Sequence, residues 1–278
     1  MSAIRIVEVG PRDGLQNEPR FVPTDVKIAF VDALSECGFG EIEVSSFVSA
    51  KWIPQLADAE QVFAGIQRNP GVVYMALVPN EAGLERAQAA KADKLAVFTA
   101  ASETFSRKNS NASIAETIQR FRPVVRNAGV PVRGYISTAF HCPYEGPIAP
   151  QQVLPVAQAL LELGCSELSI GDTIGKATPG EVMLLFERLV TACPPDRLCA
   201  HFHDTYGNAV ENARAALSMG ITSFDASAGG MGGCPYAPGA PGNVATEALL
   251  AAFSGQTGID AEKLAAASAI VRPYILGS

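Results

Sequence analysis

Two of the three histidines in the chain stand two residues apart, in His201-Phe202-His203-Asp204. They close a strand-like run over residues 198–203. Because residues i and i+2 of a strand point to the same face, both imidazoles should face one side and Phe202 the other. Two imidazoles on one face suit a divalent metal, although a hydrogen-bonded core pair would have the same spacing.

Oxygen ligands for such a metal are available at two other places in the chain. Asp13 follows the strand-like run 4–9, and Asn243 ends a glycine-rich stretch. Each also has a simpler interpretation, since an aspartate before glycine shapes turns and an asparagine before a helix caps it. Taken with His201 and His203 they make a set of two nitrogens and two oxygens, which favours Mg²⁺ or Mn²⁺ over a thiolate-binding metal.

The glycine-rich stretch, residues 229–243, contains six glycines and three prolines and therefore predicts a loop. Cys234 lies in its middle, where its thiol could transfer a proton or act as a nucleophile. The alternative is a flexible connector with an inert thiol. We expect a flexible loop that closes over a site by hinging at residues 229–233.

Three further charged residues lie at or inside predicted strands. Arg12 precedes Asp13 and could stabilise an oxyanion. Glu43 lies within a predicted strand, and a carboxylate that points from there into the interior of the fold needs a cationic partner. Arg12 is the obvious candidate. Asp172 follows the run 167–170 and could assist a deprotonation.

These residues fall on an alternating pattern of strand-like and helix-like segments. Eight such units in 278 residues favour a (β/α)8 TIM barrel, expected here as one catalytic domain over residues 1–278 with an extra C-terminal helix. Active sites of such barrels lie at the C-terminal ends of the strands. The expected strands are 4–9, 41–45, 72–78, 94–99, 132–138, 167–170, 198–203 and 223–226. The expected helices are 24–37, capped by Thr24, then 54–67, 81–90, 114–128, 151–163, 179–192, 208–219, 244–253 and 261–275, with a longer loop before residue 114.

Composition limits the classes of protein that the chain can belong to. The chain is 48% hydrophobic and 18% charged, which is typical of a globular enzyme, and its net charge of −7 argues against general binding of nucleic acid or anionic membranes. Its six cysteines are scattered without a Cys-x-x-Cys pair, so we expect reduced thiols. No apolar run is long enough for a membrane span, and a strand pattern begins at residue 4, so we expect a cytoplasmic protein.

Several motifs together resemble the 3-hydroxy-3-methylglutaryl-CoA lyase family, within the wider group of metal-dependent lyase barrels. The resemblance extends over nearly the whole chain, and the first and last motifs are specific. The motifs are Val-Glu-Val-Gly-Pro-Arg-Asp-Gly-Leu-Gln-Asn-Glu at 7–18, Ser-Phe-Val-Ser at 46–49, Arg-Gly-Tyr at 133–135, Cys-Pro-Tyr-Glu-Gly at 142–146, Gly-Asp-Thr-Ile-Gly at 171–175, His-Asp-Thr-Tyr-Gly at 203–207, Gly-Gly-Cys-Pro-Tyr at 232–236 and Gly-Asn-Val-Ala-Thr-Glu at 242–247.

The resemblance implies cleavage of 3-hydroxy-3-methylglutaryl-CoA to acetyl-CoA and acetoacetate, as in leucine degradation and ketone body formation. It implies a Mg²⁺ or Mn²⁺ ion, and a homodimer is compatible with it. Two alternatives remain: a lyase for a related 3-hydroxyacyl-CoA, and a non-catalytic, thiol-regulated binding protein. The implied residues are Asp13, His201, His203 and Asn243 for the metal, Arg12, Cys234, Glu43 and Asp172 for catalysis, and Arg12, Gln16, Tyr135 and Thr173 for substrate. Lys51, Arg107 and Lys108 are candidates for the CoA phosphates.

Overall fold

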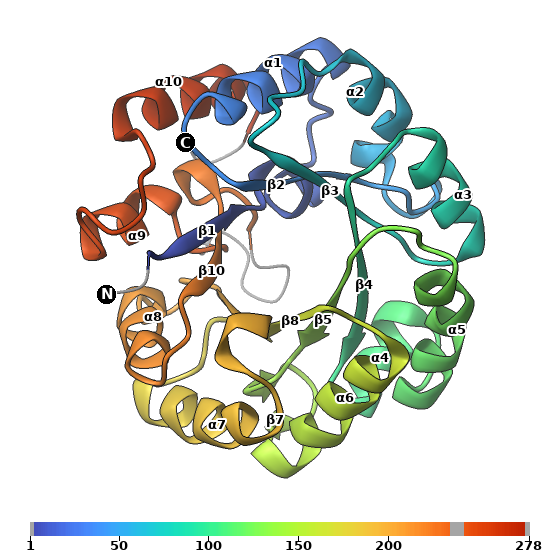
Figure 1. The fold of residues 1–278 in the computed structure, drawn as a ribbon, viewed down its shortest axis with the longest axis vertical. Helices are drawn as coiled ribbons and strands as arrows, with labels where there is room; N and C mark the ends of the chain where they lie inside the picture. Colours follow the sequence, from blue (N-terminus) through green and yellow to red (C-terminus); the bar gives the residue numbers. More distant parts are fainter. Residues whose placement is uncertain (1–2, 234–241, 276–278) are drawn as a thin grey trace.

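The computed structural model describes residues 3–233 and 242–275, and eight of its strands form a closed parallel barrel (Figure 1). The predicted (β/α)8 fold is therefore confirmed. Around the barrel the strand order is β1-β10-β9-β8-β5-β4-β3-β2. The barrel strands are β1 Arg5–Glu8, β2 Glu41–Ser46, β3 Val73–Leu77, β4 Lys94–Ala100, β5 Val132–Ser137, β8 Glu167–Asp172, β9 Leu198–Phe202 and β10 Ser223–Ala226.

Helices surround this barrel on the outside (Figure 1). Local signals set their ends: Ser113 and Thr178 begin two of them with capping boxes, and Gly164 ends another in the left-handed conformation at φ 111°. The helices are α1 Thr24–Ser35, α2 Ala59–Gly65, α3 Glu81–Ala89, α4 Glu103–Ser110, α5 Ile114–Arg126, α6 Pro150–Leu163, α7 Pro179–Ala192, α8 Ala209–Ser218, α9 Thr246–Ala252 and α10 Ala261–Val271.

Short elements complete the connections between strands and helices. The turn after β1 is a π-helical turn over Gly10–Gly14, and β6 (His141–Cys142) pairs with β7 (Gly146–Pro147) in a small hairpin. The 3-10 turns are Pro54–Leu56, Pro195–Arg197, Ala228–Gly230 and Arg272–Tyr274. Among the residues that the structure describes, no helix combines the length and the apolar character that crossing a bilayer requires.

The core has an apolar layer between barrel and helices and a more polar interior inside the barrel. At the N-terminal end of the barrel, Arg5 and Lys94 form ion pairs with Glu41 and Glu167. Both carboxylate side chains are buried, so each depends on its cationic partners. The C-terminal end is left for the polar residues of the site.

Four details differ from the sequence-based expectations. The loop expected before residue 114 contains α4, which Ser102 caps by accepting a hydrogen bond from the Phe105 amide. The helix expected over 54–67 is a 3-10 turn followed by α2, and the last helix ends at Val271. Thr24 does not cap α1: Pro23 holds the cap position, and the Thr24 hydroxyl donates to Asp58 at 2.8 Å.

Candidate active site

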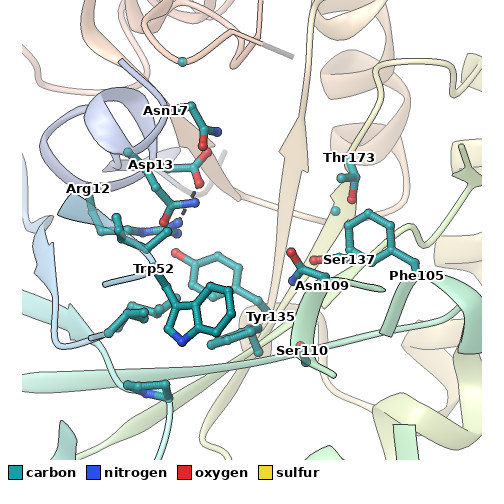
Figure 2. Close-up of a pocket in the computed structure, with 18 of the residues that line it drawn as sticks. Arg12, Asp13, Asn17, Trp52, Phe105, Asn109, Ser110, Tyr135, Ser137 and Thr173 are labelled. Atoms are coloured by element: carbon teal, nitrogen blue, oxygen red, sulfur yellow. Dashed lines mark hydrogen bonds and ion pairs between the residues drawn. The ribbon is translucent and has the colours of Figure 1, made fainter. Parts of the chain in front are cut away.

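A cavity of about 710 Å³ opens at the C-terminal ends of the barrel strands. The four residues predicted to bind substrate, Arg12, Gln16, Tyr135 and Thr173, all line it. Figure 2 shows Arg12 on one side of this pocket and Thr173 on the opposite side, with Tyr135 between them. The strand-end rule therefore brings residues from β1, β5 and β8 to one space.

Asp13, His201 and His203 form a cluster at this cavity that could hold a metal ion. One ligand atom from each lies within 4.8 Å of the others. The histidines lie at the end of β9 with ring centroids 5.3 Å apart, and His201 Nε2 lies 3.9 Å from Asp13 Oδ2. Phe202 packs in the outer core against Phe140, as the period of two predicted.

The protonation states of Asp13 and His203 fit a divalent cation, whereas Asp225 and Asp13 outweigh burial and raise the pKa of His201, which must lose its Nε2 proton to bind one. Burial opposes ionisation of Asp13, but Arg12 and the two histidines outweigh it and lower the pKa of Asp13 to about 2. Burial, aided by His201, lowers the pKa of His203 to about 4, so its imidazole is neutral at pH 7. His203 Nδ1 is buried without a hydrogen-bond partner in the described part of the chain. An ionised carboxylate and an unpaired neutral imidazole are the forms that metals bind.

Asn243 reaches the same cluster from the far end of the glycine-rich stretch. Its Nδ2 donates to Asp13 Oδ2 at 2.8 Å and to the carbonyl of Met231 at 3.2 Å. It does not cap the following helix, because α9 begins at Thr246 with Ala245 at the cap position. The backbone of Asn243 instead forms an isolated β-bridge with His203, which fixes its position beside the histidines.

Arg12 is shared between two carboxylates. Its Nη1 lies 2.5 Å from Asp13 Oδ1 and its Nη2 lies 2.6 Å from Glu43 Oε2, so the predicted pairing of Glu43 with Arg12 is confirmed. The Tyr135 hydroxyl donates to the same Glu43 oxygen at 3.0 Å, and its ring centroid lies 5.3 Å from the guanidinium carbon of Arg12. Because both nitrogens are held, the guanidinium has a fixed position at the cavity wall.

Asp172 is not among the residues that line the cavity, and its carboxylate holds a turn. Its two carboxylate oxygens accept the backbone amides of Lys176 at 3.1 Å and Ala177 at 2.9 Å. Burial raises the pKa of Asp172 to about 6 in spite of these amides. The neighbouring Thr173 does line the cavity. The contacts of Asp172 thus make it a residue that shapes the loop carrying Thr173.

The two candidate thiols cannot be compared directly, because Cys234 lies outside the described residues. Cys142 is buried, and its sulfur lies 3.0 Å from the Ser102 hydroxyl at the start of α4. That contact is typical of a thiol that packs a loop. Of the candidates for CoA phosphates, Lys108 lines the cavity, while Lys51 lies over the Trp52 ring and Arg107 is 3.9 Å from Glu103.

The sequence-based analysis missed two kinds of residue at the site. Trp52, Asn109 and Ser110 line the cavity from the loop before α2 and from α4, and Figure 2 shows Trp52 on the same side of the pocket as Arg12. The helix cap at Ser102 was the signal for α4. Asp225 accepts a hydrogen bond from His201 inside the barrel. The signal for it was a charged residue within a short apolar strand.

Comparisons with known proteins point in one direction. A family model described as HMGL-like matches residues 3–271. The chain is 52% identical over 267 residues to the cytoplasmic 3-hydroxy-3-methylglutaryl-CoA lyase of Rattus norvegicus, a match that covers 94% of this chain and 78% of that relative. Among solved structures, hydroxymethylglutaryl-CoA lyase from Pseudomonas aeruginosa superposes with a TM-score of 0.97 at 49% identity, covering 100% of this chain and 94% of that one. An HMG-CoA lyase from Acinetobacter baumannii, solved in complex with coenzyme A and 3-methylmalate, superposes with a TM-score of 0.93 at 38% identity and covers 98% of this chain and 91% of its own.

Proposed function

This chain belongs to the HMGL-like family, and from that premise we propose that it is a divalent-metal-dependent lyase that cleaves 3-hydroxy-3-methylglutaryl-CoA to acetyl-CoA and acetoacetate. The observation that carries the proposal is the position of the Asp13, His201 and His203 cluster. It lies beside the fixed guanidinium of Arg12, at one wall of a cavity large enough for an acyl chain.

Asp13, His201, His203 and Asn243 would hold the cation, with Mg²⁺ or Mn²⁺ favoured by the mixed nitrogen and oxygen donors. A half-turn of the Asn243 side chain about its last bond exchanges Nδ2 for Oδ1, which makes the amide an oxygen ligand. When bound, such an ion supplies Lewis acidity that favours loss of the proton of the substrate's tertiary hydroxyl.

Arg12 would stabilise the negative charge that carbon–carbon cleavage leaves on the acetyl-CoA half of the substrate. The tertiary hydroxyl would give its proton to a water molecule in the cavity, the bond between C2 and C3 would break to give the ketone of acetoacetate, and the electron pair of that bond would leave a thioester enolate. A guanidinium that Glu43 and Asp13 already hold does not have to reorganise when that charge appears. Glu43 would act through Arg12, and Asp172 through the loop that carries Thr173.

Cys234 would deliver the proton that converts the enolate carbon to the methyl group of acetyl-CoA. A thiol on a loop that closes over the cavity can reach that carbon and keep water away from it. Gln16, Tyr135 and Thr173 would contact the acyl group from the cavity wall. Lys108 and Trp52 both line the cavity and would meet the CoA arm, and the Acinetobacter relative was solved with coenzyme A.

The proposal extends to the setting of the reaction. We propose one catalytic domain over residues 1–278, active in the cytoplasm as the name of the rat relative states for that protein. The reaction would serve leucine degradation and ketone body formation, and the enzyme would work as a homodimer. Cell fractionation and the mass of the purified protein in solution test the location and the assembly.

The first test is an activity assay on the purified chain. Protein treated with a chelator should lose cleavage of 3-hydroxy-3-methylglutaryl-CoA, and Mg²⁺ or Mn²⁺ should restore it. Product formation is followed as acetoacetate and acetyl-CoA together. Full turnover in the presence of excess chelator would refute the role of the metal. Faster turnover of another 3-hydroxyacyl-CoA would support the alternative substrate instead.

The second test separates the two thiols. Cys234→Ala should lower kcat by roughly 10²–10⁴-fold, because a lost acid–base group costs a factor of that size. Cys142→Ala should keep kcat and lose stability, because Cys142 packs against Ser102 in the loop wall. Steady-state kinetics and thermal unfolding of both variants give the answer. Equal losses of kcat would mean that the proton-transfer role is assigned to the wrong cysteine.

A further inference from the structure

Asp225 is a buried carboxylate inside the barrel for which the proposed reaction has no use. It lies on β10 directly opposite His201 on β9, in the register of the two parallel strands. Its Oδ2 lies 3.1 Å from Nδ1 of His201, while Nε2 of the same ring lies on the side of Asp13. The imidazole therefore stands between two carboxylates and presents a different nitrogen to each.

The four contacts of Asp225 fix what each of its oxygens can do. Oδ2 also accepts the Ser169 hydroxyl at 2.8 Å, and Oδ1 accepts Arg133 Nη2 at 2.6 Å and the Cys199 thiol at 3.2 Å. The side chains of Asp225 and Arg133 are both completely buried. A carboxylate beside a buried guanidinium is ionised and can only accept hydrogen bonds.

That constraint determines the tautomer of His201. Since Asp225 only accepts, the hydrogen that faces it must be on Nδ1 of His201, so in the neutral, metal-binding form of the ring the lone pair is on Nε2, toward Asp13. A neighbouring carboxylate of this kind also fixes the ring plane and makes the free nitrogen a stronger donor.

We propose that Asp225 is a positioning residue for the metal centre: it holds His201 in the tautomer and orientation that present Nε2 to the cation, and Arg133 keeps Asp225 ionised. The inference rests on the proposed function for the presence of a metal. It adds two residues behind the ligand His201 on β9. These are Asp225 on β10, which contacts His201, and Arg133 on β5, which contacts Asp225.

A simpler role for Asp225 is to neutralise Arg133. The guanidinium is buried, and its Nε and Nη1 have no hydrogen-bond partner in the described part of the chain, so Asp225 is a main source of its compensation. Loss of that charge alone is expected to destabilise the fold. The two roles separate when both charges are removed together.

The experiment measures Mn²⁺ binding to chelator-treated protein by isothermal titration calorimetry. The variants are Asp225→Asn, the double variant Asp225→Asn with Arg133→Met, and the control Glu167→Gln. Asn at 225 retains an oxygen of the right shape but no charge, and the double variant leaves no uncompensated guanidinium. Glu167 is also a buried barrel carboxylate, paired with Arg5 and Lys94 and opposite Arg133 in the register of β5 and β8. It makes no contact with His201, so Glu167→Gln shows what loss of a negative charge near Arg133 does by itself.

We expect Asp225→Asn to bind Mn²⁺ about 10–100-fold more weakly, the range found when the carboxylate partner of a metal-binding histidine is removed. The double variant should bind as weakly even though its thermal stability is higher than that of the single variant. Glu167→Gln should lose stability and bind Mn²⁺ like the parent chain. In steady-state kinetics of the Asp225 variants, the Mn²⁺ concentration that gives half-maximal activity should rise. The fold-change in that concentration should exceed the fold-decrease in kcat at saturating Mn²⁺.

Parent-like Mn²⁺ affinity in the double variant would overturn the inference, because it would show that Asp225 only balances Arg133. The Mn²⁺ affinity of the double variant decides between the two roles even if Asp225→Asn alone fails to fold. Failure of the parent chain to bind Mn²⁺ would instead refute the proposed metal centre, so the two failures are distinguishable.

Discussion

At the scale of single residues, the site is organised around one guanidinium. Arg12 lies in the π-helical turn after β1, and one of its nitrogens faces Asp13 while the other faces Glu43. These contacts have two effects. Arg12 lowers the pKa of Asp13, and the two carboxylates hold the guanidinium that would stabilise the enolate. The planar guanidinium directs a separate nitrogen at each carboxylate, which holds it in one orientation.

Arg12→Lys tests that geometry while keeping the charge. Lysine has one ammonium nitrogen in place of two separate guanidinium nitrogens. It can approach Asp13 or Glu43, but the side-chain charge at position 12 should lose its fixed position. We expect kcat to fall by roughly 10²–10³-fold, the cost of one lost oxyanion donor, with a smaller change in KM. Steady-state kinetics at saturating Mn²⁺ measures both. An unchanged kcat would show that the charge alone suffices.

At the scale of elements, the site depends on where two loops touch. Gly232, in the loop after β10, has a φ of 98°, and a Cβ on it would lie 2.8 Å from Asn243 Nδ2 and 3.1 Å from Gly14 Cα. The loops after β1 and β10 therefore meet with no space between them at Gly232. That contact places Asn243 beside Asp13.

Gly232→Ala should therefore disturb the metal centre as well as the backbone. We expect Mn²⁺ affinity to fall at least about 10-fold, as for loss of a supporting contact at a metal ligand, because Asn243 must shift. The matched control is Gly229→Ala, where φ is 66° and the nearest atoms to a Cβ are 3.9 Å away. It should cost about 1–2 kcal/mol of stability, from backbone strain alone, and leave the affinity intact. Equal Mn²⁺ affinity in the two alanine variants would contradict the contact.

At the scale of the whole molecule, Glu8 joins the beginning of the barrel to its end. Its carboxylate on β1 accepts the Ala228 amide after β10 at 2.9 Å and the Thr246 hydroxyl at the start of α9 at 2.8 Å. Burial raises the pKa of Glu8 from its usual value to about 8, although three hydrogen bonds oppose this shift. The folded state therefore holds a proton that the unfolded state releases near pH 4.5.

This difference predicts a pH-dependent stability with a definite sign. Glu8 contributes its full stability below pH 4.5 and loses it as the pH rises toward 8, because only the unfolded chain ionises in that window. At 1.36 kcal/mol per unit, the free energy of unfolding should fall by up to about 3 kcal/mol between pH 5.5 and 8. Glu8→Gln, a neutral isostere, should remove this part of the slope. Urea unfolding at both pH values measures it, and parallel slopes in the two proteins would contradict the shift.

The sequence by itself determined the architecture and most of the candidate site. Alternating segments indicate eight strand–helix units because the periodicities of strands and helices are local properties. The same locality places His201 and His203 on one face and Arg12 and Asp13 at a strand end. The residue types and the family resemblance together propose roles for Asn243 and Cys234, and of these two only Asn243 is among the described residues.

Only the tertiary structure decided which of these side chains meet. Asp13 and Asn243 are 230 residues apart in the chain and form a hydrogen bond, and the partner of His201 is Asp225 on the neighbouring strand. Such contacts depend on the closure of the barrel and on strand register, which no local pattern encodes. The tertiary structure likewise shows the partners of Asp172, whose carboxylate accepts the Lys176 and Ala177 amides of the following loop.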